Sequence, residues 1–81
     1  MASVYSEDYQ SVISMLKNAR KERGITQTQL SEAFGRPQSF IAKVENGERR
    51  LDIVEFLHLA RLLNFEPAAV IDKIYRKYQP L

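Results

Sequence analysis

The chain has 81 residues, which is room for one domain with a small core. Hydrophobic residues make up 44% and charged residues 27%, a composition that argues against disorder. There is no cysteine and one histidine, so a disulfide framework, a thiolate or histidine-rich metal site and a cysteine nucleophile are all excluded. No apolar run approaches the roughly 18 residues of a membrane span, and no signal peptide is visible. We therefore expect one cytoplasmic domain, residues 1–81, without cofactor, metal or membrane contact.

The positive charge is concentrated in the middle of the chain, although the net charge is only +2. Residues 20–50 hold seven basic and four acidic side chains, a net of +3, while residues 1–19 carry −1 and residues 51–81 carry 0. Such an excess favours an anionic partner for that segment. A solvated basic face is the alternative that charge alone leaves open.

Helical periodicity recurs along the chain and strand patterns are absent, which predicts a compact all-α fold of five short helices. The expected helices cover residues 7–23, 27–34, 37–45, 52–63 and 67–78. Their predicted caps are Ser6, the Thr26/Gln29 capping box and the Asp52/Glu55 capping box. The third helix is expected to start with Pro37 at its first position, where the missing N–H costs nothing.

Residues at three- and four-residue spacing mark one largely apolar face of each predicted helix. In the first helix the face consists of Tyr9, Val12, Ile13, Leu16, Ala19 and Arg20, in the second of Leu30, Ala33 and Phe34, and in the third of Phe40, Ile41 and Val44. In the fourth helix it consists of Ile53, Phe56, Leu57, Ala60 and Leu63, and in the fifth of Val70, Ile71, Ile74, Tyr75 and Tyr78. His58 lies off the fourth face, so we expect it to be exposed and without a catalytic role.

Residues 27–47 have the spacing of a helix-turn-helix. Two short helices meet at Gly35, and a pair that crosses at roughly 90–120° needs a tight turn. Glycine at that point accepts a positive φ that other residues resist.

A longer set of residues carries a family resemblance. They are Arg20, Gly24, Ile25, Thr26, Gln27, Leu30, Gly35, Ser39, Ile41, Val44, Glu45, Asn46, Gly47, Leu59, Ala60 and Leu63. With them, residues 16–70 resemble the phage repressor and Cro-like helix-turn-helix family, also called the XRE family. The resemblance implies a lambda-repressor-like domain that binds double-stranded DNA through residues 27–47.

Two residues depart from the family pattern. Ser31 stands where the family usually has Ala, a change that we expect the packing to tolerate. Arg36 stands at the expected N-cap of the third helix, where Ser or Thr is usual and a capping oxygen contributes about 1 kcal/mol. Because a cation there also opposes the helix dipole, a contact with phosphate or guanine would explain Arg36, and the alternative is that it points to solvent.

The predicted base-reading residues are Arg36, Gln38, Ser39 and Lys43. The second helix of such a pair lies in the major groove with its first residues against base edges. Gln suits adenine and Lys suits guanine. Gln38 and Ser39 could instead be ordinary helix-start residues, Lys43 could reach a phosphate, and Phe40 could either pack beneath the helix or touch a thymine methyl.

The predicted phosphate contacts are Gln27, Asn46, Arg49 and Arg50. The resemblance places the first two on either side of the recognition helix, while the two arginines follow in the next loop. A solvated loop is the alternative for the arginines.

The resemblance also implies a structural ion pair between Arg20, late in the first helix, and Glu45, at the end of the third. A bidentate pair there would fasten the recognition helix to the rest of the domain.

The last helix offers a candidate surface for a homodimer, formed by Val70, Ile71, Ile74, Tyr75 and Tyr78. Tyr5 and Tyr9 would add aromatic area, which is typical of interfaces. The alternative is that these side chains complete the core of the monomer.

The favoured function is a sequence-specific transcriptional regulator, most often a repressor in this family, which binds a palindromic operator as a dimer. One alternative is the antitoxin of a toxin–antitoxin pair, whose first partner would be a protein. Another is a controller protein of a restriction–modification system. An enzyme is not expected, because the sequence has no Gly-rich phosphate loop and no carboxylate pair that the pattern brings into a cleft.

Overall fold

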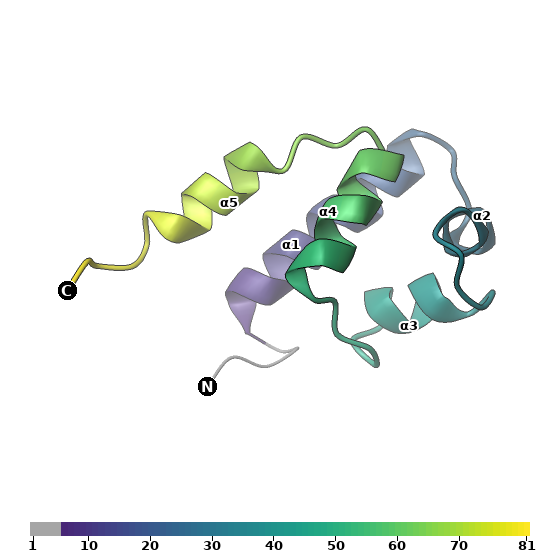
Figure 1. The fold of residues 1–81 in the computed structure, drawn as a ribbon, viewed down its shortest axis with the longest axis horizontal. Helices are drawn as coiled ribbons and strands as arrows, with labels where there is room; N and C mark the ends of the chain where they lie inside the picture. Colours follow the sequence, from purple (N-terminus) through teal and green to yellow (C-terminus); the bar gives the residue numbers. More distant parts are fainter. Residues whose placement is uncertain (1–5) are drawn as a thin grey trace.

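The computed structural model describes residues 6–81, which form five α-helices and no strand. In chain order they are α1 (Glu7–Glu22), α2 (Gln27–Ala33), α3 (Phe40–Glu45), α4 (Ile53–Leu62) and α5 (Ala68–Tyr75). In Figure 1, α1 and α4 occupy the middle of the molecule, α2 and α3 lie at one end, and α5 extends away at the other. The predicted all-α arrangement of five short helices is thus confirmed.

The predicted caps account for where most helices begin. The Thr26 hydroxyl accepts the amide N–H of Gln29 at 3.0 Å, and the Gln29 side chain accepts the amide of Thr26 at 2.8 Å. Asp52 and Glu55 form the same reciprocal pair at 2.7 and 3.0 Å. Both capping boxes therefore satisfy amides that a helix N-terminus leaves without intrahelical partners.

The core lies where α1 and α4 meet the α2–α3 pair. Its buried apolar side chains are Ile13, Leu16, Leu30, Phe34, Phe40, Ile41, Val44, Leu51, Phe56, Leu59, Ala60, Leu63 and Val70. Three of the six residues of α3 belong to this set. The short helix is therefore held by burial of one face, since six residues have too little intrinsic helical stability to stand alone.

The predicted start of α3 is wrong. The helix begins at Phe40, not at Pro37, because residues 37–40 first form a tight turn in which the Phe40 amide donates to the Pro37 carbonyl at 2.9 Å. Arg36 is therefore not the N-cap. Ser39 takes that position, without a side-chain capping bond.

Several predicted core positions are also corrected. On α4, Ile53 and Leu57 are 64% and 44% exposed, and on α2 Ala33 is exposed. Phe56, Ala60 and Leu63 are buried as predicted, together with Leu59. The helix is nearly apolar around its circumference at its start, so periodicity could not tell which side faces the core.

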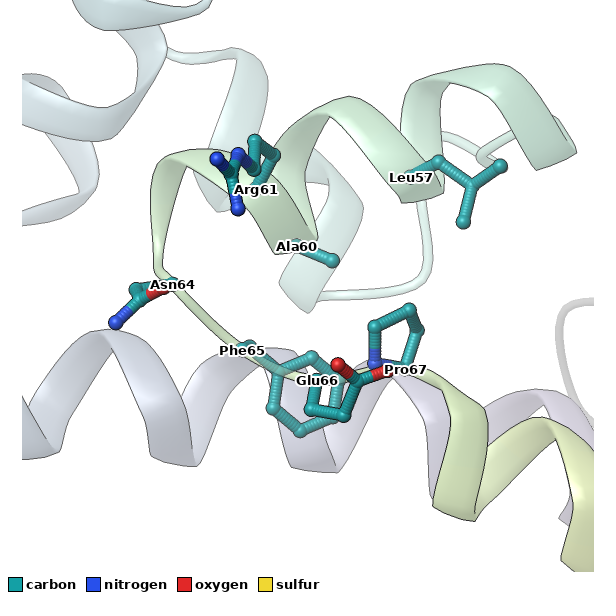
Figure 2. A pocket seen from close by; sticks show the side chains of 7 residues that line it. All are labelled: Leu57, Ala60, Arg61, Asn64, Phe65, Glu66 and Pro67. Carbon is teal, nitrogen blue, oxygen red and sulfur yellow. The ribbon is translucent and has the colours of Figure 1, made fainter.

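The last helix is shorter than predicted and ends at Tyr75. Its connection to α4 includes Asn64 with a left-handed φ of 52°. In Figure 2, Phe65 and Pro67 of this connection face Leu57 and Ala60 of α4 across a shallow hollow.

Among residues 6–81, no helix is both long and apolar enough to cross a membrane.

Candidate nucleic-acid interface

Ser31 joins the two helices of the helix-turn-helix. It is completely buried, and its hydroxyl accepts the amide N–H of Ile41 at 3.0 Å. Its carbonyl also accepts the amide of Arg36 at 3.0 Å. Because Ile41 lies in the first turn of α3, where amides have no intrahelical acceptor, Ser31 caps α3 from α2. No local pattern indicates this role, and the sequence predicted only that Ser31 would be tolerated.

The ion pair implied between Arg20 and Glu45 is present. Arg20 donates to the two carboxylate oxygens of Glu45 at 2.8 and 3.0 Å and to the Ile25 carbonyl at 2.8 Å. Gln27 adds a third hydrogen bond to the same carboxylate at 2.8 Å. The Arg20 and Glu45 side chains are 9% and 6% exposed, so the pair fixes the end of α3 to both α1 and α2.

Polar side chains form the outer surface of α3 and the turn before it. Gln38 and Ser39, in the turn, and Lys43, on the helix, are exposed. None of the three makes a side-chain hydrogen bond or ion pair within residues 6–81. Phe40 has the opposite placement: it is buried, with its ring 5.5 Å from that of Phe34, so the packing alternative holds for it. The turn before α3 and the outer side of the helix therefore present amide, hydroxyl and ammonium groups to solvent, without partners among residues 6–81.

Arg36 does not simply point to solvent. Its guanidinium lies 5.0 Å from the centre of the Phe34 ring and 4.8 Å from that of Phe40, and Nη2 donates to Glu55 at 2.8 Å. Guanidinium groups at this distance are attracted by the face of an aromatic ring. A base contact from Arg36 stays a prediction. The guanidinium group would have to reach the base from this position against the two rings and Glu55.

Arg49 meets Arg36 at the same carboxylate. Its Nη1 and Nη2 donate to the two oxygens of Glu55 at 2.8 and 2.9 Å, and its guanidinium lies 5.1 Å from the centre of the Phe40 ring. The hydrogen bonds from Arg49, followed by those from the Asp52 amide and Arg36, lower the pKa of Glu55 to about 2. Glu55 therefore stays ionised under all ordinary conditions.

The other predicted phosphate contacts lie around α3. Asn46 is the C-cap of α3 and is exposed. Arg50 is exposed in the next loop, with its guanidinium 4.9 Å from the centre of the Tyr9 ring. Gln27 begins α2, and its side-chain amide donates to the Glu45 carboxylate as described above.

The predicted dimer surface is divided between core and surface. Val70 is buried at 3% exposure, and Ile74 packs partly against the core, so these two complete the monomer. Ile71 and Tyr75 are 41% and 76% exposed. Tyr78 is 65% exposed but donates its hydroxyl to Asp8 at 2.6 Å. Tyr9 is partly buried and accepts the Leu51 amide, and Tyr5 lies outside the described residues.

The start of α4 supplies three exposed apolar side chains, of which two were expected on the buried face and the third, Val54, was not singled out by the sequence. Ile53, Val54 and Leu57 are 64%, 70% and 44% exposed. Ile53 and Ile71 line one apolar hollow, so the start of α4 and the exposed side of α5 adjoin.

The remaining candidate groups are His58 and the acidic side chains. His58 is exposed as expected, with its ring centre 4.7 Å from that of Phe34 in an edge-on contact. No group of acidic and histidine side chains within residues 6–81 could hold a metal ion.

Known proteins match this arrangement. Residues 16–70 match the model of the helix-turn-helix family. An XRE-family like protein from Pseudomonas syringae pv. tomato str. DC3000 is 41% identical, with a TM-score of 0.76 over 90% of this chain and 91% of that one. A mutant of the restriction-modification controller protein C.Esp1396I is 22% identical, with a TM-score of 0.71 over 89% and 91% of the two chains, which shows a common fold. No curated protein matches the chain. The chain belongs to the XRE-like helix-turn-helix family of DNA-binding transcription regulators.

Proposed function

We propose that this protein represses transcription as a homodimer that binds a palindromic operator, with the start of α3 in the major groove of each half-site. One observation carries the proposal: Gln38, Ser39 and Lys43 are exposed at the start of α3 and on its outer side, while its other face is buried. Side chains in this position reach base edges in helix-turn-helix complexes. Gln38 would read adenine, and Lys43 would read guanine or hold a phosphate. Ser39 would tolerate either of these bases beside it.

The contacts that hold α3 support a reading role. Its first turn is capped by Ser31 and its last residue is bound by Arg20 and Gln27. A binding site held on rigid elements loses less conformational entropy when it binds. Phosphate contacts from Gln27, Asn46, Arg49 and Arg50 would flank the helix and set its register without reading sequence.

A homodimer is proposed because one recognition helix reads only a few base pairs. Two half-sites about 34 Å apart, centre to centre, would supply the needed specificity. The proposed interface consists of Ile53, Val54 and Leu57 on α4 with Ile71 and Tyr75 on α5, which we call the α4–α5 face. Adjacent exposed apolar side chains of this kind favour a protein partner, here a second copy.

Selection of binding sites from random duplex DNA tests the DNA proposal. The expected result is a palindromic consensus whose half-sites repeat about one helical turn apart. Recovery of unrelated sequences, or of a single unrepeated half-site, would contradict it.

Sedimentation tests the dimer. Val54→Asp and Tyr75→Asp should each shift the protein toward the monomer and weaken operator binding, with helical content unchanged. Ser14→Asp adds the same charge at an exposed position of α1 outside the α4–α5 face, and should leave the mass unchanged. If all three variants sediment alike, the interface lies elsewhere.

A further inference from the structure

Glu55 is a buried carboxylate that holds two arginines from different segments. Its side chain is 10% exposed, whereas those of Arg36 and Arg49 are 36% and 39% exposed. Arg36 belongs to the turn before α3 and Arg49 to the loop after it. One residue of α4 therefore brings together guanidinium groups from both sides of the recognition helix.

The two guanidinium groups are also fixed by a ring. They lie 4.8 and 5.1 Å from the centre of the Phe40 ring, and Phe40 is the first residue of α3. Each group is thus held from two directions, by an anion and by an aromatic face. Arginine side chains lose considerable rotamer freedom when they are fixed, and here that entropy is lost before any ligand arrives.

The cluster keeps donors and charge for a second anion. Two guanidinium groups and one carboxylate leave a net charge of +1. Nε and Nη1 of Arg36 have no hydrogen-bond acceptor within residues 6–81, because only Nη2 contacts Glu55. Arg36 is followed directly by the exposed residues Pro37, Gln38 and Ser39.

We propose that Glu55 is a positioning residue for DNA recognition: by holding Arg36 and Arg49 against Phe40, it directs them to defined atoms of the operator. This inference rests on the proposed function. Without the carboxylate, the two arginines would be mobile cations that can reach any phosphate. Glu55 therefore contributes to discrimination between sequences and lowers affinity for random DNA.

Glu55→Gln tests the proposal, because the amide oxygen can still accept the Asp52 N–H of the capping box while the charged pairing is lost. Glu48→Gln is the matched control. Glu48 is an exposed loop residue near Arg49, and its side chain has no hydrogen bond or ion pair within residues 6–81. Both variants remove one negative charge. Both should therefore bind random duplex more tightly, because less negative charge on the protein repels the DNA phosphates.

The two variants should differ in specificity. The ratio of affinities for the selected operator and for random duplex should fall about tenfold in Glu55→Gln, the scale expected for mobilising two long side chains. It should change by less than about twofold in Glu48→Gln, since no guanidinium is released. If Glu55 had a purely structural role, its replacement would weaken binding to operator and to random duplex together. Equal ratios in the two variants would overturn the proposal.

NMR of the DNA-free protein supplies a readout that does not depend on the operator. The order parameters of the Arg36 and Arg49 Nε–Hε groups should fall in Glu55→Gln and stay unchanged in Glu48→Gln. Unchanged values in both variants would contradict the positioning role even where DNA binding is altered.

A second substitution covers the case in which Glu55→Gln does not fold. Arg49→Lys keeps the charge but cannot make the bidentate pair. It should lower the specificity ratio while affinity for random duplex is unchanged. A preserved ratio would mean that Arg49 serves only as a cation.

The outcomes separate this proposal from the one on which it rests. If the parent protein prefers no sequence over random duplex, the proposed function fails and this proposal with it. If the parent protein discriminates but Glu55→Gln does so equally well, only the positioning role is refuted.

Discussion

Replacing Ser31 by Ala removes the acceptor for the Ile41 amide at a site with no access to solvent. An amide left without a partner in the interior costs about 1–3 kcal/mol. Alanine regains about 0.5 kcal/mol because it has the higher helix propensity. The expected net loss is therefore about 0.5–2.5 kcal/mol, which in a domain of this size lowers Tm by about 2–20 °C.

Thermal and urea unfolding of Ser31→Ala beside Ser14→Ala measures this loss. Ser14 is an exposed residue inside α1, so its replacement gains the same propensity without breaking a buried bond. Amide hydrogen exchange gives the local readout, since the Ile41 amide should exchange faster in Ser31→Ala alone. Equal Tm values for the two variants, with Ile41 still protected, would refute the capping role.

Two further predictions concern stability. Arg20→Met should cost about 3 kcal/mol in urea unfolding, because the Glu45 carboxylate keeps its burial but loses two of its three donors. Lys21→Met, at an exposed neighbouring position, should cost little, and a similar loss in both would show that the ion pair adds nothing. The low pKa of Glu55 predicts acid sensitivity: the folded state depresses it from 4.5 to about 2, so its contribution is full above pH 4.5 and is lost as the pH falls toward 2. Glu55→Gln should flatten the decline in unfolding free energy over that range, and an identical pH profile would contradict the pairing.

The parts of the fold that local chemistry determines were predictable from the sequence. Both capping boxes, the left-handed Gly35 and the polar surface at Gln38 and Ser39 follow from residues within a few positions of one another. The ion pair of Arg20 with Glu45 spans 25 positions, and only the family resemblance implied it.

The parts that depend on tertiary contacts were not predictable. The start of α3 was misplaced because residues 37–40 first form a turn, and the amide of Ile41 in the first helical turn is capped by Ser31, ten residues earlier in the chain. The positions of the Arg36 and Arg49 side chains depend on Glu55, which the sequence marked only as half of a capping box. On α5, the pattern could not separate Val70, which faces the core, from Tyr75, which does not.

Base reading by the start of α3 is tested most directly by the affinity of Gln38→Ala for operator and for random duplex. Gln38 is exposed, so the fold should be unchanged, and Gln79→Ala provides a control at an exposed position after α5. Gln38→Ala should lose about 1–3 kcal/mol on the selected operator, concentrated at one A·T pair in each half-site. Affinity for random duplex should stay the same, because phosphate contacts supply that binding. An equal loss on both DNAs, or no loss on either, would contradict base reading by α3.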